Sequence, residues 1–276
     1  MANILIVGLG YIGHALENEL IKQGHKVYGL CRTSRATKGT LIQKDLFELR
    51  AEELPKNLDF VFYMVSSDGR DLQAYQRAYP QGVKKIIECL YLNSHDIKKF
   101  FYISSTRVCQ SLGDEWVTEE TPLEQEDPYA IILNEAEKIV NNSSLSSTIV
   151  RLGGIYGPGR SHLINAIKKQ TTNLLLEDIY TNRIHQADVV GLLIHMMNMH
   201  EKLEGLYLGV DSCPVLFNDL ISWLAKENNI RLTGSATQSK RKSKKVSNAK
   251  ILKTGYKFQF PDYHSGYSDI FSTQKS

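Results

Sequence analysis

The chain has 276 residues and a formal net charge of +3. This length is enough for one large α/β domain, or for one domain with a small lobe. The small net charge argues against binding to nucleic acid or to an anionic membrane surface, and no uninterrupted apolar run reaches the ~18 residues that a membrane-spanning helix needs.

The cysteines and the N-terminus predict a reducing compartment. Cys31, Cys89, Cys109 and Cys213 are scattered, with no C-x-x-C pair, which is typical of buried thiols rather than of a disulfide framework or a zinc site. The N-terminus lacks the basic-then-apolar pattern of a signal peptide. We therefore expect a cytoplasmic protein without a bound metal.

Residues 3–13, with the sequence N-I-L-I-V-G-L-G-Y-I-G, predict a strand, a tight turn and the start of a helix. The apolar run over 4–7 is typical of a strand buried on both faces of a parallel sheet. Glycines at G-x-G-x-x-G spacing allow the turn, the close approach of a pyrophosphate and tight helix–strand packing, and the new helix presents free N–H groups to the phosphates. The candidate cofactor-binding residues of this stretch are Gly8, Gly10, Tyr11, Ile12 and Gly13.

Residues 25–30 predict the second strand, and the position after it bears on the choice of cofactor. An acidic residue there would bind the ribose 2′-OH of NAD. This chain has Cys31 instead, followed closely by Arg32 and Arg35, and arginine binds phosphate in a forked, charge-assisted way. We therefore favour NADP, with NAD as the second choice; a solvated basic loop is the alternative interpretation of the two arginines.

Further strands are predicted over 41–43, 59–65, 100–103 and 147–152, with helical spacing between them. This spacing continues over 72–92 despite Pro80 and predicts a helix there. This alternation predicts an α/β fold with a doubly wound, Rossmann parallel sheet. In such sheets, ligands bind at the carboxyl ends of the strands. The candidate cofactor contacts at these ends are Asp45, Leu46, Val65 and Ser66.

Five motifs occur in an order typical of one family. They are I-S-S-T-R-V at 103–108, D-P-Y-A at 127–130, R-L-G-G-I-Y-G-P-G at 151–159, R-I-H-Q-A-D-V-V at 183–190 and K-V-S-N-A-K-I at 245–251. With the glycine-rich turn, they resemble the extended short-chain dehydrogenase/reductase superfamily, in its NAD-dependent epimerase/dehydratase branch. The likeness covers nearly the whole chain and is strongest to the short, atypical members, the nucleoside-diphosphate-sugar epimerase-like proteins.

The resemblance implies a catalytic pair and one departure from the family pattern. The family's catalytic Ser/Thr falls on Ser105 and its catalytic tyrosine on Tyr129, while the lysine expected four residues later is replaced by Leu133. A free tyrosine has a pKa near 10, so without a nearby cation it is a poor base at neutral pH. Lys138 lies nine residues after Tyr129, on the opposite face of a helix. Tyr129 is therefore either a catalytic residue or a packing aromatic.

The second half of the chain predicts a small C-terminal substrate lobe. We assign 1–152 and 184–202 to the dinucleotide-binding domain, and 153–183 and 203–276 to the lobe. A strand over 205–210 is expected to open the second lobe segment. Aromatic residues in the C-terminal part are expected to fold back over the lobe.

Two side chains here are candidate substrate contacts. Arg160 follows a loop that family likeness places near the nicotinamide, and the alternative is a solvated charge. His185 lies in a segment that borders the substrate cleft in the family; it titrates near neutrality, and the alternative is a structural histidine. Asp188 precedes the apolar run 189–197 and is predicted to cap that helix.

Residues 239–245 form a basic run, and the residues concerned are Lys240, Arg241, Lys242, Lys244 and Lys245. Without interleaved aromatic residues, such a run is typical of a solvated loop. The alternatives are that the run binds the phosphate groups of a substrate or that it binds nucleic acid. Binding to nucleic acid would show as salt-sensitive binding to DNA or RNA.

Together these features predict an NAD(P)-binding epimerase/dehydratase or reductase that acts on a small polar substrate such as a nucleotide sugar. The expected partner is this small molecule, with neither nucleic acid nor a membrane, and a homodimer is compatible with the sequence. The alternative is a NADP-binding sensor or interaction protein that has lost catalysis, since Leu133 removes the expected lysine.

Overall fold

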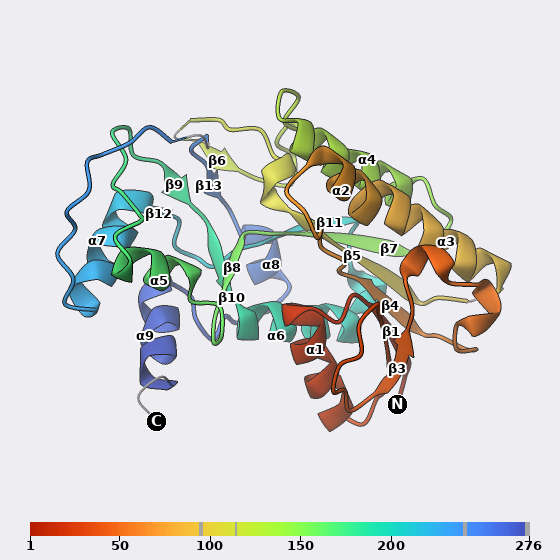
Figure 1. The fold of residues 1–276 in the computed structure, drawn as a ribbon. Coiled ribbons are helices and arrows are strands. Elements are labelled where there is room, and N and C mark those ends of the chain that lie inside the picture. Colours follow the sequence, from red (N-terminus) through yellow and green to blue (C-terminus); the bar gives the residue numbers. More distant parts are fainter. Residues whose placement is uncertain (94–95, 114, 240–241, 274–276) are drawn as a thin grey trace. The chain divides into compact units, whose positions relative to one another are not determined.

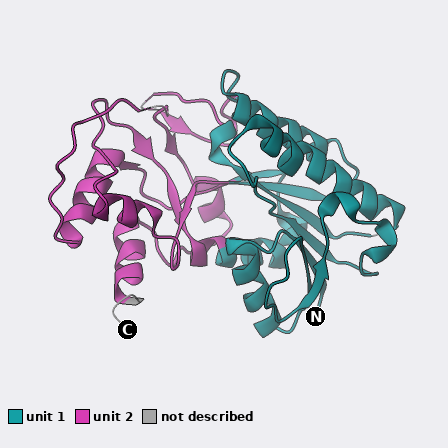
Figure 2. Cartoon of the chain, viewed as in Figure 1, with its two compact units in different colours: residues 1–108, 123–151, 190–207 teal, residues 109–122, 152–189, 208–276 magenta. Residues whose placement is uncertain are grey.

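The computed structural model describes residues 1–93, 96–113, 115–239 and 242–273. The chain divides into two compact units, which Figure 2 colours separately. The first comprises residues 1–108, 123–151 and 190–207, and the second comprises residues 109–122, 152–189 and 208–276. Segment 109–122, which we expected in the dinucleotide-binding domain, therefore belongs to the second unit. Which ligand each unit binds stays a prediction, because compactness alone assigns no ligand.

The central sheet has seven parallel strands in the order β11-β7-β5-β4-β1-β2-β3 (Figure 1). The strands are β1 (Asn3–Val7), β2 (Lys26–Cys31), β3 (Thr40–Gln43), β4 (Phe60–Tyr63), β5 (Lys99–Ser105), β7 (Ser147–Leu152) and β11 (Leu206–Gly209). β1 pairs in parallel with both β2 and β4, with Ile4 opposite Val27 on one side and Phe60 on the other. This confirms the predicted Rossmann fold.

Helices cover both faces of this sheet. The helix α1 (Tyr11–Lys22) lies on one face, whereas α2 (Leu72–Gln76), α3 (Gly82–Leu92) and α4 (Pro128–Asn141) lie on the other (Figure 1). Helical spacing turns the apolar residues of α3 into the core, where Ile86 and Leu90 are fully buried with Val61 and Phe100 of the sheet. None of the helices in the described ranges has the length and apolar character needed to cross a membrane.

The single helix that the spacing predicts over 72–92 is divided by a π-helical turn, Arg77–Gln81. Pro80 lies inside this turn. Proline has no N–H to donate and its ring crowds the preceding turn, so a regular α-helix cannot continue through it. Asp71 caps the first part, α2, by accepting a hydrogen bond of 2.8 Å from the Ala74 N–H.

The strand predicted over 205–210 forms, but in the central sheet rather than in the lobe. The Ile149 N–H donates to the Gly205 carbonyl at 2.7 Å, and the same offset recurs between Gly153 and Gly209 at 3.0 Å. A constant offset means that β11 runs parallel to β7, where it forms the edge strand. An apolar run predicts a strand but not its partner, which is why the sequence misplaced it.

The second unit consists of short strands and four helices in its described residues. The strands are β6 (Trp116–Val117), β8 (Gly154–Tyr156), β9 (Tyr180–Thr181), β10 (Arg183–His185), β12 (Val215–Leu216) and β13 (Lys245–Val246), and the helices are α5 (His162–Lys168), α7 (Phe217–Glu227), α8 (Ala249–Lys253) and α9 (Tyr263–Thr273). The strands pair as β8 with β10, β9 with β12 and β6 with β13. Ile164, Leu220 and Tyr267 lie in the apolar core of this unit.

Asp188 holds the aromatic C-terminal segment rather than capping its own helix. The helix α6 (Gln186–Asn198) begins two residues before Asp188, so the predicted cap is wrong. The buried Asp188 carboxylate instead accepts hydrogen bonds from the Tyr256 hydroxyl at 3.0 Å and from the N–H groups of Gln259 and Phe260 at 2.7 and 2.9 Å. A buried carboxylate needs several donors, and here a distant segment supplies them.

Part of the basic run is built into the second unit. Lys240 and Arg241 lie outside the described residues. The Lys244 ammonium donates to the Cys109 carbonyl, and the Lys245 ammonium lies 4.8 Å from the centre of the Tyr180 ring. Lys244 and Lys245 therefore make internal contacts, unlike the solvated loop that the sequence predicts.

Candidate functional site

The turn after β1 requires glycine at two places. Gly8 has a φ of +103°, in the left-handed region, and a Cβ on it would lie 3.0 Å from the backbone of Met64 and Val65. A Cβ on Gly13 would lie 2.2 Å from the Gly8 carbonyl oxygen. These two glycines thus let the turn lie against the end of β4 and let α1 pack close to β1.

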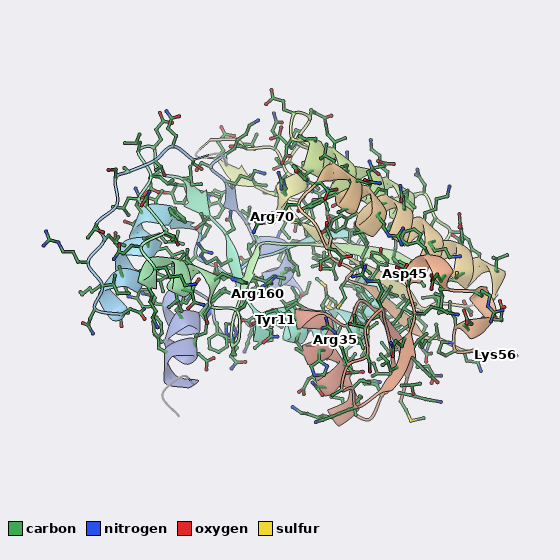
Figure 3. The ribbon with its side chains drawn as sticks, viewed as in Figure 1. Tyr11, Arg35, Asp45, Lys56, Arg70 and Arg160 are labelled. Atoms are coloured by element: carbon green, nitrogen blue, oxygen red, sulfur yellow. The ribbon has the colours of Figure 1, made fainter. Side chains whose placement is uncertain are left out.

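Gly10 leaves open space at the N-terminus of α1. Its φ is −80°, and no atom lies within 4 Å of a Cβ built on it. No side chain caps the helix, and its first turn holds no acidic residue. No capping side chain of Gly10 and no first-turn carboxylate therefore opposes the positive end of the helix dipole, and such a helix start favours the binding of phosphate. Tyr11, labelled in Figure 3, and Ile12 belong to this first turn.

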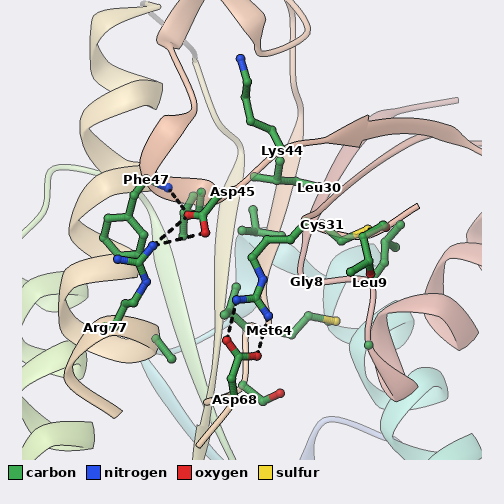
Figure 4. A pocket seen from close by; sticks show the side chains of 18 of the residues that line it. Gly8, Leu9, Leu30, Cys31, Lys44, Asp45, Phe47, Met64, Asp68 and Arg77 are labelled. Carbon is green, nitrogen blue, oxygen red and sulfur yellow. Dashed lines mark hydrogen bonds and ion pairs between the residues drawn. The ribbon is translucent and has the colours of Figure 1, made fainter. Parts of the chain in front are cut away.

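A cavity of about 230 Å³ lies beside the glycine turn (Figure 4). Its lining comes from the carboxyl ends of β1 and β2, from the loops that follow β1 to β4, and from the helical segments that follow β3 and β4. The predicted residues that line it are Gly8, Gly10, Arg32, Arg35, Asp45, Leu46, Val65 and Ser66. Sites for whole drug-sized ligands occupy roughly 300–1,000 Å³, so this volume is enough for one nucleoside half of a dinucleotide.

Four further lining residues bear a charge or a ring and are not among the residues predicted from the sequence: Lys44, Phe47, Asp68 and Arg77. Two of them flank the predicted pair Asp45 and Leu46, so a signal was present. No signal in the sequence pointed to Arg77, because the residue spacing does not reveal the π-helical turn that positions it.

Asp45 is held from two sides. Its carboxylate accepts a hydrogen bond of 2.9 Å from the Phe47 N–H, which caps the short 3-10 helix η1 (Leu46–Glu48), and it pairs with the Arg77 guanidinium at 3.2 Å. That guanidinium lies 4.0 Å from the centre of the Phe47 ring. On this side of the cavity, a ligand would therefore meet the fixed carboxylate of Asp45 and the guanidinium of Arg77 beside the Phe47 ring.

The two arginines after β2 both have partners. The Arg32 guanidinium forms a two-pronged ion pair with Asp68, with distances of 2.7 and 2.8 Å (Figure 4). Arg35 donates from Nη1 to the Leu9 carbonyl at 2.8 Å and so braces the glycine turn. Burial raises the pKa of the neighbouring Cys31 thiol.

Ser105 and Tyr129 come from β5 and α4. Ser105 ends its strand, and Tyr129 stands in the first turn of α4, which Pro128 opens and Asp127 caps by accepting from the Tyr129 N–H at 3.1 Å. Arg107 contacts both residues. Its N–H donates to the Ser105 hydroxyl at 3.2 Å, and its guanidinium pairs with Asp127 and lies 4.4 Å from the centre of the Tyr129 ring.

The Tyr129 hydroxyl is hydrogen-bonded in this structure. It donates to the carbonyl of Arg70, a residue labelled in Figure 3, at 2.7 Å. The ring of Tyr75 packs edge-on at 4.8 Å. Leu133, one turn further along α4, is 2% exposed and belongs to the core, so its position offers no polar group to a ligand.

The two candidate substrate contacts lie in the second unit, in different surroundings. Arg160 is exposed, and its N–H donates to the Gly157 carbonyl at 3.0 Å (Figure 3). His185 is 2% exposed and packs against the rings of Phe260 and Tyr156, with centroid distances of 4.1 and 5.3 Å. Burial lowers the pKa of His185. The described residues contain no cluster of three or more potential metal ligands.

Comparison with known families gives a match over most of the chain. The sequence model of the NAD dependent epimerase/dehydratase family matches residues 4–206. YeeZ of Escherichia coli strain K12 is 29% identical over 172 residues, which are 58% of this chain and 61% of YeeZ. That match therefore spans less than two thirds of the relative.

Three solved structures resemble the whole chain. A protein of Methylobacillus flagellatus, described as a NAD-dependent epimerase/dehydratase, is 30% identical with a TM-score of 0.84 over 100% of this chain and 99% of its own. The UDP-glucuronic acid 4-epimerase of Bacillus cereus, in complex with UDP-glucuronic acid and NAD, is 18% identical with a TM-score of 0.82, covering 98% and 99%. The human epimerase family protein SDR39U1, with NADPH, is 17% identical with a TM-score of 0.80, covering 98% and 99%. The last two likenesses show the fold alone.

Proposed function

The chain belongs to the NAD dependent epimerase/dehydratase family, and on that premise we propose that it binds NADP at the glycine turn and acts on a small polar substrate such as a nucleotide sugar. The observation that carries the proposal is the open, uncapped helix start at Gly10 beside a cavity lined by the predicted cofactor residues. Backbone N–H groups at such a helix start bind a pyrophosphate.

The preference for NADP rests on the residues that follow β2. Cys31 stands where an acid would bind the ribose 2′-OH of NAD, and Arg32 and Arg35 line the same cavity. The related human protein was solved with NADPH and the bacterial epimerase with NAD. Both carriers therefore occur on this fold, and the two arginines are the feature of this chain that favours NADP.

The proposed chemistry assigns one role to each polar residue near the start of α4. The bound nicotinamide would accept or return a hydride. Ser105 would hydrogen-bond the reacting oxygen of the substrate, and Tyr129 would move a proton to or from that oxygen. For this the Tyr129 hydroxyl exchanges its bond to the Arg70 carbonyl for one to the substrate. Arg160 and His185 remain proposed substrate contacts.

A second candidate function is a NADP-binding sensor or interaction protein without catalysis. Leu133 favours it, because a buried aliphatic side chain stands where the family resemblance expects the lysine that assists the tyrosine.

Cofactor binding is tested by titrating NADPH fluorescence and by calorimetry with NADPH and NADH. We expect Arg32→Ala to weaken the binding of NADPH about 10-fold or more, because a charge-assisted hydrogen bond is lost. The binding of NADH should weaken less than about 2-fold. Equal losses would refute the 2′-phosphate assignment.

Catalysis is tested by incubating nucleotide sugars and carbonyl compounds with NADPH and with NADP⁺. Net oxidation or reduction of the cofactor reports a reductase or dehydrogenase, and chromatography of the sugar products reports epimerisation or dehydration, which leave the cofactor unchanged overall. The wild type is compared with Tyr129→Phe and with Leu133→Lys, each checked for folding by thermal melting. Turnover that depends on Tyr129 supports the enzyme. Tight cofactor binding with no turnover in any variant supports the sensor.

A further inference from the structure

A carboxylate of the chain holds the guanidinium that the proposed function assigns to the 2′-phosphate of NADP. Arg32 Nη1 and Nη2 each contact one oxygen of Asp68, at 2.7 and 2.8 Å (Figure 4). Arginine binds phosphate in this same forked geometry. Arg32 follows β2 and Asp68 follows β4, the two strands that flank β1, and both line the cavity beside the glycine turn.

Asp68 differs from Asp45, the other acidic residue that lines the cavity, and from the acidic residues of the neighbouring segments, because among the residues that the structure describes it caps no helix and accepts from no backbone N–H. Asp45 caps η1, Glu53 accepts from the Arg50 N–H at 2.8 Å, and Asp71 caps α2. Within the described parts of the chain, Arg32 is the one group to which Asp68 hydrogen-bonds. The Asp68 side chain is 66% exposed, so its carboxylate can move into solvent without breaking any other contact.

We propose that Asp68 is an internal competitor for the 2′-phosphate, and that this competition sets the strength of the preference for NADP over NAD. The proposal rests on the proposed function. A 2′-phosphate displaces the carboxylate from the same two donors, and the two anions repel each other while both are near. NAD has a hydroxyl at this place and leaves the pair of Arg32 and Asp68 intact. Asp68 therefore weakens NADP binding selectively.

The size of the effect follows from the exposure of the pair. Exposed ion pairs contribute little, because water and salt screen them and two long side chains lose freedom. We expect Asp68→Asn to raise the affinity for NADPH about 5-fold, which corresponds to about 1 kcal/mol. The affinity for NADH should stay within about 2-fold.

The test is a double-mutant cycle measured by titration calorimetry on the full chain. Wild type, Asp68→Asn, Arg32→Ala and the double variant are each titrated with NADPH, NADH and 2′,5′-ADP. The gain from Asp68→Asn should appear with NADPH and 2′,5′-ADP and vanish in the Arg32→Ala background. Glu52→Gln removes one exposed negative charge outside the cavity lining and should leave all affinities unchanged.

The outcomes separate this proposal from the proposed function. If the wild type binds neither dinucleotide, the proposed function fails and the role of Asp68 fails with it. If the wild type binds NADPH but Asp68→Asn does not strengthen it, the role of Asp68 alone is overturned. An equal gain for NADH, or a gain that persists without Arg32, overturns that role as well.

Discussion

The guanidinium of Arg107 lies 4.4 Å from the centre of the Tyr129 ring. A positive charge is therefore adjacent to the predicted catalytic tyrosine, although the position one helical turn later holds the buried Leu133. Arg107 reaches this place from the end of β5, and its ion pair with Asp127 fixes it there. One residue thus orders the first turn of α4 and the end of the strand that carries Ser105.

We expect Arg107→Met to lower kcat about 10-fold while the Kd for NADPH stays unchanged, because loss of the cation–ring contact and of the Asp127 pair removes roughly 1–2 kcal/mol of ordering from Tyr129. Steady-state kinetics and NADPH titration check this. Arg70→Met is the control, since Arg70 hydrogen-bonds to Tyr129 through its backbone carbonyl, which the variant keeps. An equal loss in both variants would show that the effect is a general loss of charge.

Alanine at two glycines of the turn should have different effects, one on folding and the other on cofactor binding. Gly13→Ala places a methyl 2.2 Å from the Gly8 carbonyl, so we expect it to lower the free energy of unfolding by about 2–3 kcal/mol, as overpacking does. The methyl group of Gly10→Ala would meet no atom within 4 Å, so this variant should fold normally. It should nevertheless weaken the binding of NADPH at least about 10-fold, because the methyl group occupies the space through which the pyrophosphate approaches the backbone. Thermal melting measures the effect on folding, and calorimetry measures the effect on NADPH binding. Normal NADPH binding by Gly10→Ala would contradict the proposal that the pyrophosphate binds at the glycine turn.

Glu137 joins α4 to the sheet through a buried ion pair. Its carboxylate contacts Arg151 of β7 at 2.6 Å and accepts from the Ser104 hydroxyl of β5 at 2.5 Å, and Glu137 and Arg151 are 3% and 4% exposed. Glu137→Gln removes the carboxylate that pairs with the buried guanidinium, so denaturant unfolding should show a loss of about 3–5 kcal/mol. Glu135→Gln, on the exposed face of the same helix, should change stability by less than about 0.5 kcal/mol. A loss in Glu137→Gln no larger than in this control would mean that water reaches Arg151.

The pH dependence of stability should report on Asp211. This residue is 1% exposed, and burial, followed by the nearby carboxylates of Asp262 and Asp188, raises its pKa to about 8 against the opposing hydrogen bond from Cys213. Below about pH 4 the carboxyl is protonated in both the folded and the unfolded chain. Between about pH 4 and 8 only the folded chain keeps the proton, so the free energy of unfolding falls as pH rises, by a few kcal/mol, and is flat above about pH 8.

Asp211→Asn should remove this decline, because the amide stays neutral at every pH and still accepts from the Cys213 N–H, which lies 3.1 Å away in the wild type. Urea unfolding at a series of pH values measures the free energy of unfolding of both proteins and so detects the decline. Asp219→Asn, at an exposed position, should leave the decline in place. A wild-type chain whose stability rises between pH 4 and 8 relative to Asp211→Asn would contradict the assignment.

Local patterns in the sequence determined the sheet and the glycine turn. The apolar run before Gly8, the spacing of the three glycines and the helical periodicity after them are properties of neighbouring residues, and the physics of strands, turns and helix starts acts over the same short range. For that reason the sequence also placed Arg32 and Arg35 at the cavity, since they follow directly on a predicted strand.

Only the tertiary structure decided which charge meets which partner. Asp68 is 36 residues from Arg32, and Arg77 is 32 residues from Asp45; Asp188 reaches a segment about 70 residues away. No periodicity relates such pairs, because their contact depends on the order of strands in the sheet and on how loops return over the strand ends. The partners of buried and site-lining charges therefore had to come from the folded chain, even where the sequence had already identified the charges themselves.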